Sequence, residues 1–270
     1  MIEDPHVGLG HLMIAIAEPY REGLEAYHRW FERDHMYSAV LIGPGAFAAE
    51  RYVATQDLKA LRYPSDGGVF SSIDRGSFVA LYYLVKDSVE EHYAWSYPQS
   101  ARLAQAGRSN RDRELVLTWL CDYRGRVARE AESVPPEITL DHRHEGLVMV
   151  WLESASDERP AELARWLEEE YLPRSLRDSP IDQVLLFTPR DFPTPAEDVP
   201  ITPGSIAPNP WTERGLLLLY FLDPSPADIW HEHFAPLGDA IALSERGRVT
   251  LAAPFLTTDR GTRAHLDELW

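Results

Sequence analysis

The sequence predicts an α+β fold built from two tandem copies of one β-α-β-β-α-β unit, and two repeated stretches carry this prediction. The helix-like stretch "YHRWFERDH" begins at Tyr27, and "LARWLEEEY" begins 136 residues later at Leu163. The stretch "ALYYLVKDSVEEHYAWSYP" from Ala80 matches "LLYFLDPSPADIWHEHFAP" from Leu218 at an offset of 138 residues. Two long matches with nearly equal offsets indicate an internal duplication.

Each copy contains the same elements in the same order. The first copy begins with an apolar strand, and its first helix has one apolar face formed by Leu24, Tyr27, Trp30 and Phe31. Without a gap, the 136-residue offset extends back to the first strands and places Leu12 over Val148. The strands are predicted at 11–17, 46–54, 78–85 and 113–123, then at 147–153, 182–189, 215–222 and 248–258; the second helices are predicted at 88–107 and 226–245. This order is that of the ferredoxin-like unit.

The duplication divides the chain into residues 1–130 and residues 144–270, joined by a charged linker at 131–143. A four-stranded sheet with both helices on one face leaves its other face uncovered. We therefore expect the two sheets to face each other and close into an α+β barrel. The side chains between them are expected to form a core, or to line a pocket if they do not fill the space.

The composition excludes several classes of function. The formal net charge is −17, from 43 acidic residues against 26 Lys and Arg, and such a surface repels nucleic acid and anionic membranes. The single cysteine, Cys121, leaves no internal disulfide or thiolate cluster. The N-terminus resembles no signal peptide, and the longest apolar run is too short to span a bilayer. We expect a cytoplasmic protein that acts on a small molecule and is compatible with a homodimer.

The stretch "YHRWFERDHMYSAVLIGPGAFAAERYVA", residues 27–54, resembles the EthD-like branch of the dimeric α+β barrel superfamily. That branch has an aromatic first helix ending in histidine, a Pro-Gly turn and a strand with Arg-Tyr. The matching positions here are His35, Pro44–Gly45 and Arg51–Tyr52. The second copy departs from the pattern, with Tyr171 in place of the histidine. The resemblance therefore implies that the family's site belongs to the first copy only.

Relatives in this superfamily include cofactor-free oxygenases, isomerases, cyclases and dehydratases, and others bind haem or only sense a ligand. His35 is the first catalytic candidate, because a neutral imidazole near a helix end can move a proton. Tyr82 and Tyr83 are consecutive on a strand, so one faces the helices and the other faces the barrel. The barrel-facing phenol is a candidate donor to an enolate, and Arg51 is a candidate clamp for the same charge.

Further residues are candidates for contacts with the substrate. These are aromatic or histidine side chains on the predicted strands and helices, namely Tyr52, His11, Trp95, Trp151 and Tyr171. Each has an ordinary structural alternative, as a core or surface residue. Two long loops, at 55–77 and 189–215, are candidate lids or inter-subunit arms.

No metal is expected. His231 and His233 lie two residues apart on a predicted helix, whereas helical metal ligands lie three or four apart. Haem is the alternative cofactor, since some tandem members of the superfamily hold it in the second repeat, where His231 or His233 would be the axial ligand.

The sequence therefore predicts a protein that binds a small apolar molecule, aromatic or polyketide-like, in a barrel pocket. It is expected to convert this molecule without a cofactor by acid–base chemistry, as a lyase, isomerase or oxygenase. Two alternatives stay open: a haem-dependent oxidoreductase, and a non-catalytic binding or accessory protein.

Overall fold

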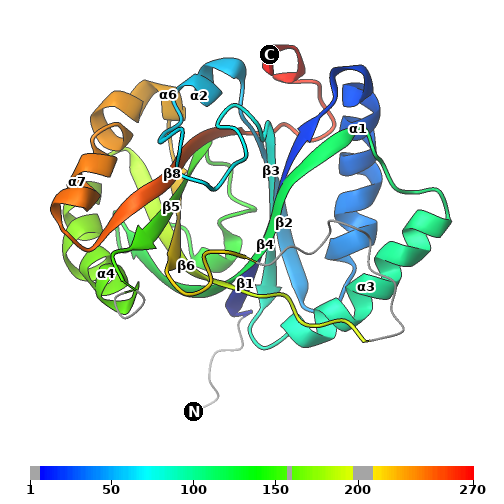
Figure 1. Cartoon of the computed structure of the whole chain (residues 1–270), viewed down its shortest axis with the longest axis horizontal. Coiled ribbons are helices and arrows are strands. Elements are labelled where there is room, and N and C mark those ends of the chain that lie inside the picture. The colour runs from blue at the N-terminus through cyan, green and yellow to red at the C-terminus, as the bar shows by residue number, and fades with distance from the viewer. Residues whose placement is uncertain (1–6, 157–159, 197–208) are drawn as a thin grey trace.

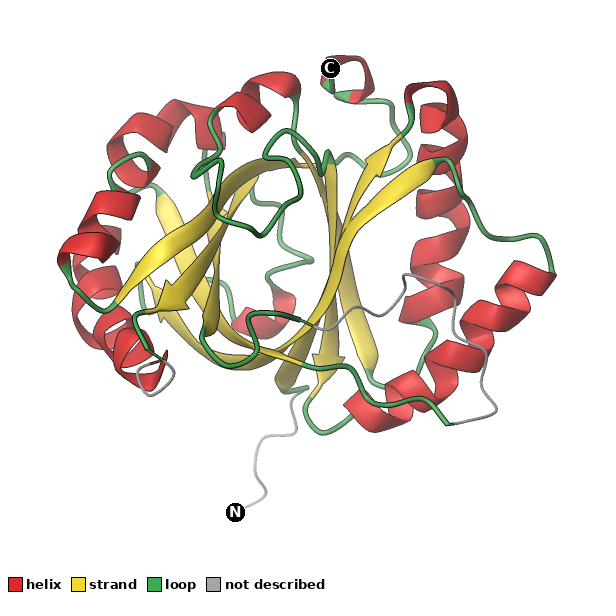
Figure 2. Ribbon diagram, viewed as in Figure 1, coloured by secondary structure: helices red, strands yellow, loops and turns green. Residues whose placement is uncertain are grey.

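The fold is a closed barrel of eight antiparallel strands with helices on its outer face. The computed structural model describes residues 7–156, 160–196 and 209–270. Around the barrel the strands follow the order β1-β3-β2-β8-β5-β7-β6-β4, and β4 pairs with β1 to close it. The helices of the two halves flank the barrel on opposite sides (Figures 1 and 2). The predicted α+β fold, with two ferredoxin-like repeats forming one barrel, is confirmed.

The strands and helical segments of the two halves follow the same order, although the second helical segment is one helix in the first half and three shorter ones in the second. The first half contains β1 (Leu9–Pro19), η1 (Arg21–Gly23), α1 (Leu24–Trp30), η2 (Phe31–Leu41), β2 (Ala46–Val53), α2 (Gln56–Ala60), β3 (Phe78–Val85), α3 (Val89–Gln105) and β4 (Arg113–Ala128). After η3 (Pro136–Ile138), the second half contains β5 (Gly146–Ser154), α4 (Pro160–Trp166), η4 (Leu167–Tyr171), α5 (Leu172–Leu176), β6 (Ile181–Arg190), β7 (Gly215–Leu222), α6 (Pro226–Ile229), η5 (Trp230–Phe234), α7 (Leu237–Leu243), β8 (Gly247–Thr257) and η6 (Leu266–Glu268).

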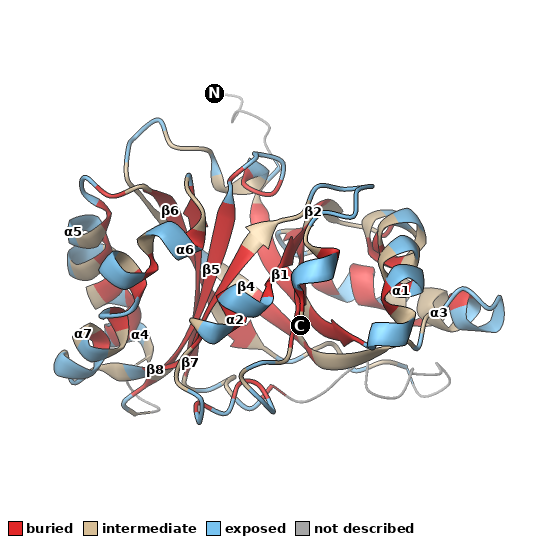
Figure 3. Ribbon diagram, turned by 90° about the horizontal axis from the view of Figure 1, so that it is seen from above, coloured by how far each residue is buried: buried red, intermediate tan, exposed pale blue. Residues whose placement is uncertain are grey.

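The barrel interior is a packed core. Alternate residues of every strand point inward, and the indoles of Trp119 and Trp151 meet edge to face with centroids 4.7 Å apart. Two further apolar clusters lie between the outer faces of the sheets and their helices, so most strand residues are buried, with β4 the least buried strand (Figure 3). The side chains between the two sheets were expected either to form a core or to line a pocket. Among the described residues they form a core, so a ligand pocket has to lie elsewhere.

The strand pairing corrects the alignment of the two halves by one residue. Leu12 pairs with Tyr83, and Leu147 pairs with Phe221, the residue that matches Tyr83 at an offset of 138. Leu12 therefore corresponds to Leu147, an offset of 135, and both point into the barrel. The ungapped alignment placed Leu12 over Val148, which faces the helices. Because side chains alternate along a strand, a slip of one residue exchanges the two faces.

The end of the chain returns to the first half. Leu266 and Leu269 are buried in the cluster beneath α1 and α3, although they follow the last strand of the second half (Figure 1). The Trp270 indole donates to Glu18, at 3.1 Å, and the Lys59 ammonium donates to the carbonyl of Leu269, at 3.0 Å.

In the parts of the chain that the structure describes, no helix combines the length and the apolar character needed to cross a membrane.

Candidate functional site

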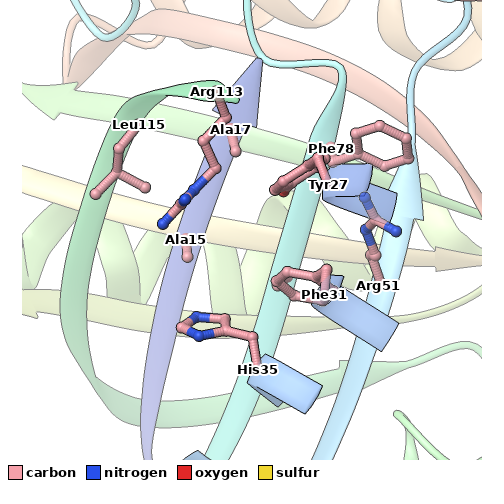
Figure 4. A pocket seen from close by; sticks show the side chains of 10 residues that line it. Ala15, Ala17, Tyr27, Phe31, His35, Arg51, Phe78, Arg113 and Leu115 are labelled. Carbon is pink, nitrogen blue, oxygen red and sulfur yellow. The ribbon is translucent and has the colours of Figure 1, made fainter. Parts of the chain in front are cut away.

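A cavity of about 270 Å³ lies on the outer face of the first sheet, beneath η2 and α3. Apolar and aromatic side chains dominate its wall, and polar side chains from α3, β4 and the loop between them also line it. The lining residues that the argument below uses are Ala15, Trp30, His35, Tyr82, Tyr93, Ser96, Arg113 and Phe192. A smaller chamber of about 30 Å³ adjoins it and shares Ala15, His35, Arg113 and Leu115 with it (Figure 4).

Small side chains in the first half leave this space open. The strand pairing matches Ala15 to Val150 and Ala17 to Leu152, and both larger residues are fully buried in the second half. On the second helix, the 138-residue offset matches Ser96 to Phe234, whose ring stacks on Trp230 with centroids 5.4 Å apart. In the second half, larger side chains therefore occupy three positions that border the two chambers in the first half.

His35 enters both chambers from η2. Its imidazole stacks on the Trp30 indole, with centroids 4.3 Å apart and planes inclined by 25°. The indole is held in turn, because its Nε1–H donates to the carbonyl of Arg108, at 2.8 Å. Among the described residues, no protein group hydrogen-bonds to the His35 ring. Burial and, to a smaller extent, the charge of Arg113 lower the pKa of His35 to about 3, against an opposing effect of Asp34, so the imidazole is neutral at pH 7.

Arg113 is a site residue that the sequence reasoning missed. It begins β4 and lines both chambers, and its guanidinium lies over the Trp30 ring, 4.7 Å from the centroid. Its Nη1 donates to the Asn110 carbonyl. Burial lowers the pKa of Arg113, but the group remains a cation at neutral pH. Among the described residues, no carboxylate forms an ion pair with it, so the site contains an uncompensated positive charge.

Two phenol groups in the outer cavity have hydroxyls that are unpartnered in the described part of the chain. Tyr82 and Tyr93 line it, and their buried hydroxyls have no hydrogen-bond partner among the described residues. Burial raises the pKa of both phenols, so both are neutral donors at pH 7. Phe192, from the loop after β6, also lines the cavity and meets Tyr93 edge to face, with centroids 5.2 Å apart. The described part of the loop at 189–215 thus contributes to the wall, while residues 197–208 lie outside the described structure.

Arg51 lines the inner chamber and is fully buried. Its guanidinium lies over the Phe78 ring, 3.7 Å from the centroid, and hydrogen-bonds to His28 Nδ1 at 3.0 Å. Glu32 lies 3.5 Å from it as the ionic partner. Arg51 Nε and Nη2 have no hydrogen-bond partner among the described residues. Figure 4 shows the Phe31 ring on the side of His35 that faces Arg51, so Arg51 is set back from the imidazole.

Three of the sequence candidates lie inside the barrel, away from both chambers. Tyr83 is the barrel-facing member of its pair, and its hydroxyl hydrogen-bonds to Thr139 at 2.7 Å. Tyr52 and Trp151 are buried in the same core. Tyr82, the helix-facing member, is the tyrosine that reaches the cavity. The expectation that the barrel-facing phenol would meet a ligand presumed a hollow barrel, and side chains fill that space instead.

The remaining candidates lie at the periphery. His11 faces the helix side of β1 and pairs with Asp122, at 2.7 Å, without lining either chamber. Trp95 is half-buried on α3 and packs over Gly43, where a side chain would collide with its ring. Tyr171 lies against Trp166 in the second half, with centroids 5.1 Å apart, which reproduces the packing of His35 on Trp30. The structure therefore brings together His35, Tyr82 and Arg51, and adds Arg113 and Tyr93.

The residues suggested for haem or metal do not form a site. His231 is exposed and His233 is half-buried on η5, and neither lines either chamber. Haem ligation through these histidines does not fit their position. In the described ranges, no group of three or more His, Cys, Asp or Glu side chains is arranged to hold a metal ion.

Neither a family model nor a curated protein sequence matches the chain. Solved structures do match it. An anthrone oxidase-like protein has a TM-score of 0.54 and 8% identity, covering 97% of this chain and 96% of that one. A monooxygenase-like protein from Fusobacterium nucleatum has a TM-score of 0.52 and 9% identity, covering 93% and 94%. A haem complex of a Rhodococcus jostii DypB variant reaches 0.48 at 9% identity, covering 94% of each chain. At these identities the likeness shows the fold, that of the ferredoxin-like α+β barrel proteins.

Proposed function

We propose that the first half of the barrel binds a small, largely apolar molecule in the 270 Å³ cavity and moves a proton on it without a cofactor. One observation supports this most strongly. An apolar cavity brings together a neutral imidazole, two unpartnered phenols and a cation without a carboxylate partner among the described residues. Unpartnered polar groups in a largely apolar cavity are typical of a ligand site, because a ligand supplies the missing hydrogen-bond partners.

The proposed reaction is proton transfer next to a carbonyl group. A ring nitrogen of His35 takes the proton of an adjacent C–H bond, and that electron pair forms a C=C bond while the carbonyl π pair moves onto oxygen. Arg113 and the Tyr82 hydroxyl stabilise the resulting enolate oxygen. In a β,γ-unsaturated carbonyl compound the enolate extends to the γ carbon, and return of the proton to that carbon completes an isomerisation, with no change in composition and no oxidant or reductant.

The low pKa of His35 fits this role only together with Arg113. An imidazole with a pKa of about 3 is a weak base in the empty cavity. An enolate formed beside it raises that pKa, because opposite charges stabilise each other in a buried site. Arg113 lowers the energy of the same enolate. His35 thus moves the proton, and Arg113 stabilises the charge that forms. We also propose that the chain belongs to the EthD-like branch, because His35 matches the motif histidine of that branch.

The test uses 2-naphthol as a stable enol analogue and 2-tetralone as a ketone with acidic C–H bonds. We expect the purified chain to bind 2-naphthol and to accelerate exchange of the α hydrogens of 2-tetralone in D₂O, followed by proton NMR. His35→Ala should retain binding and lower the exchange rate by about 100-fold, the usual size of a general-base effect. Tyr171→Ala is the matched control in the second half.

Three results would separate the alternatives. Binding of 2-naphthol with equal exchange rates for wild type and His35→Ala would favour a non-catalytic binding protein. Absence of 2-naphthol binding would refute the site altogether. Exchange lost equally in Tyr171→Ala would show a general effect on the fold rather than chemistry at His35.

A further inference from the structure

We propose that the natural ligand is a monoanion whose carboxylate enters the 30 Å³ inner chamber while its apolar body occupies the outer cavity. This inference rests on the proposed ligand-binding function and adds the charge and orientation of the ligand. Three independent features support it: the charge balance of the inner chamber, its size, and its connection to the outer cavity.

The charge balance favours one negative charge. The lining of the inner chamber contains two guanidinium groups, Arg51 and Arg113. Glu32, 3.5 Å from Arg51, compensates the first of them. Arg113 has no such partner among the described residues, and His35 is neutral at pH 7. The groups therefore sum to one positive charge, and a bound monoanion would neutralise it.

The chamber has the size of a carboxylate head. A cavity of about 30 Å³ accommodates roughly two water-sized atoms. The two oxygens of a carboxylate match this space, whereas an aromatic ring does not. The rest of the wall consists of apolar and aromatic side chains, including Phe31 and Phe78, which keep water from competing for the guanidinium.

The two chambers are adjacent and share part of their walls. Ala15, His35, Arg113 and Leu115 line both. Figure 4 shows the Arg113 guanidinium and the His35 imidazole extending into the same space from β4 and η2. A ligand with its carboxylate on Arg113 would thus have the carbon next to that carboxylate beside His35. The anion would also raise the pKa of His35, since a nearby negative charge favours the imidazolium.

The overall charge of −17 does not contradict this orientation. Exposed charges farther than about 8 Å are largely screened at physiological ionic strength, whereas the half-buried guanidinium of Arg113 is screened less. The surface charge slows the approach of an anion, and Arg113 determines its affinity once it is bound.

The test compares 2-naphthoate with its neutral counterpart 2-naphthamide, by isothermal titration calorimetry on the full chain at pH 7.5. The two probes have nearly the same shape, so the difference in affinity isolates the charge. We expect the wild type to bind 2-naphthoate at least about tenfold more tightly, which corresponds to about 1.4 kcal/mol. Arg113→Met should abolish this preference, lowering the affinity for 2-naphthoate far more than the affinity for 2-naphthamide. Arg248→Met, which removes an exposed arginine at the start of β8, should keep it.

Each outcome has a defined meaning. Equal affinity of the wild type for both probes would overturn the proposed anion site and leave the proposed binding function intact. Failure of both probes to bind would instead refute the binding function. A preference retained in Arg113→Met would show that Arg113 is not the anion partner. The 2-naphthamide titration serves as the folding control for the variant.

Discussion

The imidazole of His35 stacks on the indole of Trp30, with ring centroids 4.3 Å apart. The equivalent pair in the second half is Tyr171 on Trp166, with centroids 5.1 Å apart. Both halves therefore present an aromatic ring on a tryptophan at the same place in the fold, and only one of these rings can move a proton near neutral pH. The second half thus provides a matched control for each change in the first.

Acid should destabilise the wild type more than a His35→Phe variant. The pKa of His35 is about 3 in the folded state and near 6.5 when unfolded, so the unfolded chain binds more protons between these values. The contribution of neutral His35 is complete above pH 6.5 and is lost as the pH falls towards 3. Between pH 7 and pH 5 we expect the wild type to lose about 1–2 kcal/mol of unfolding free energy relative to His35→Phe. Urea denaturation at each pH measures this difference.

The control for the pH effect is Tyr171→Phe, which should follow the wild type at every pH. A constant difference between wild type and His35→Phe from pH 7 to pH 4 would contradict a depressed pKa. NMR titration of the His35 ring gives an independent measure of its protonation.

Ser96→Phe should close the outer cavity. Ser96 lines the cavity, and the corresponding residue of the second half, Phe234, is buried against Trp230. We expect the larger side chain to abolish 2-naphthol binding while changing the unfolding free energy by less than about 2 kcal/mol, since it enters existing space. The reverse change, Phe234→Ser, should cost about 3–5 kcal/mol because it opens a cavity in a packed cluster. Retained 2-naphthol binding by a folded Ser96→Phe variant would place the ligand elsewhere.

Tyr82→Phe should weaken ligand binding without weakening the fold. The buried hydroxyl of Tyr82 has no partner among the described residues, and neither has that of its counterpart Tyr220. Removal of an unsatisfied buried hydroxyl should leave stability unchanged or raise it by up to about 1 kcal/mol in both variants. Only Tyr82→Phe should lower 2-naphthol affinity. If Tyr220→Phe lowers the affinity equally, the hydroxyl of Tyr82 is not a ligand contact.

Arg51→Met should destabilise the protein strongly. Arg51 is fully buried, and its ionic partner Glu32 has a side-chain exposure of 5%. Removal of one member leaves a buried charge without compensation, which typically costs about 3–5 kcal/mol. The double variant Arg51→Met/Glu32→Gln should recover part of that loss, and thermal or urea denaturation of the four proteins gives the coupling. Additive effects of the two changes would show that the pair is not coupled.

Much of the fold was predictable from local pattern. The apolar runs at 78–85 and 215–222 coincide with β3 and β7 along their whole length, because continuous apolar runs of this length suit strands buried on both faces. The apolar face of the first helix also lies against the sheet as expected, with Leu24 and Tyr27 buried. The duplication predicted the topology, because the same order of strands and helices in both copies indicates that both copies form the same ferredoxin-like unit.

The register of the strands and the residues of the candidate site were harder to predict from the sequence. The one-residue difference between strand and helix offsets became visible only from the pairing of Leu12 with Tyr83 and of Leu147 with Phe221. Arg113 was missed because it belongs to no motif and is only the first residue of the predicted strand at 113–123. Its counterpart is Gly247, since the two residues pair with Pro19 and Ser154 at the same end of the first strands. With the register known, the difference between Arg113 and Gly247 would have indicated Arg113 as a candidate site residue.

The sequence by itself determined the duplicated α+β architecture and marked His35 as the residue that differs between the halves, because periodicity and repetition are properties of the chain. The tertiary structure decided where the cavity lies and which groups meet in it. Whether the space inside the barrel or the space beneath η2 stays open depends on how side chains from distant strands fill each volume. Trp119 and Trp151 fill the first, and Ala15 and Ser96 leave the second open.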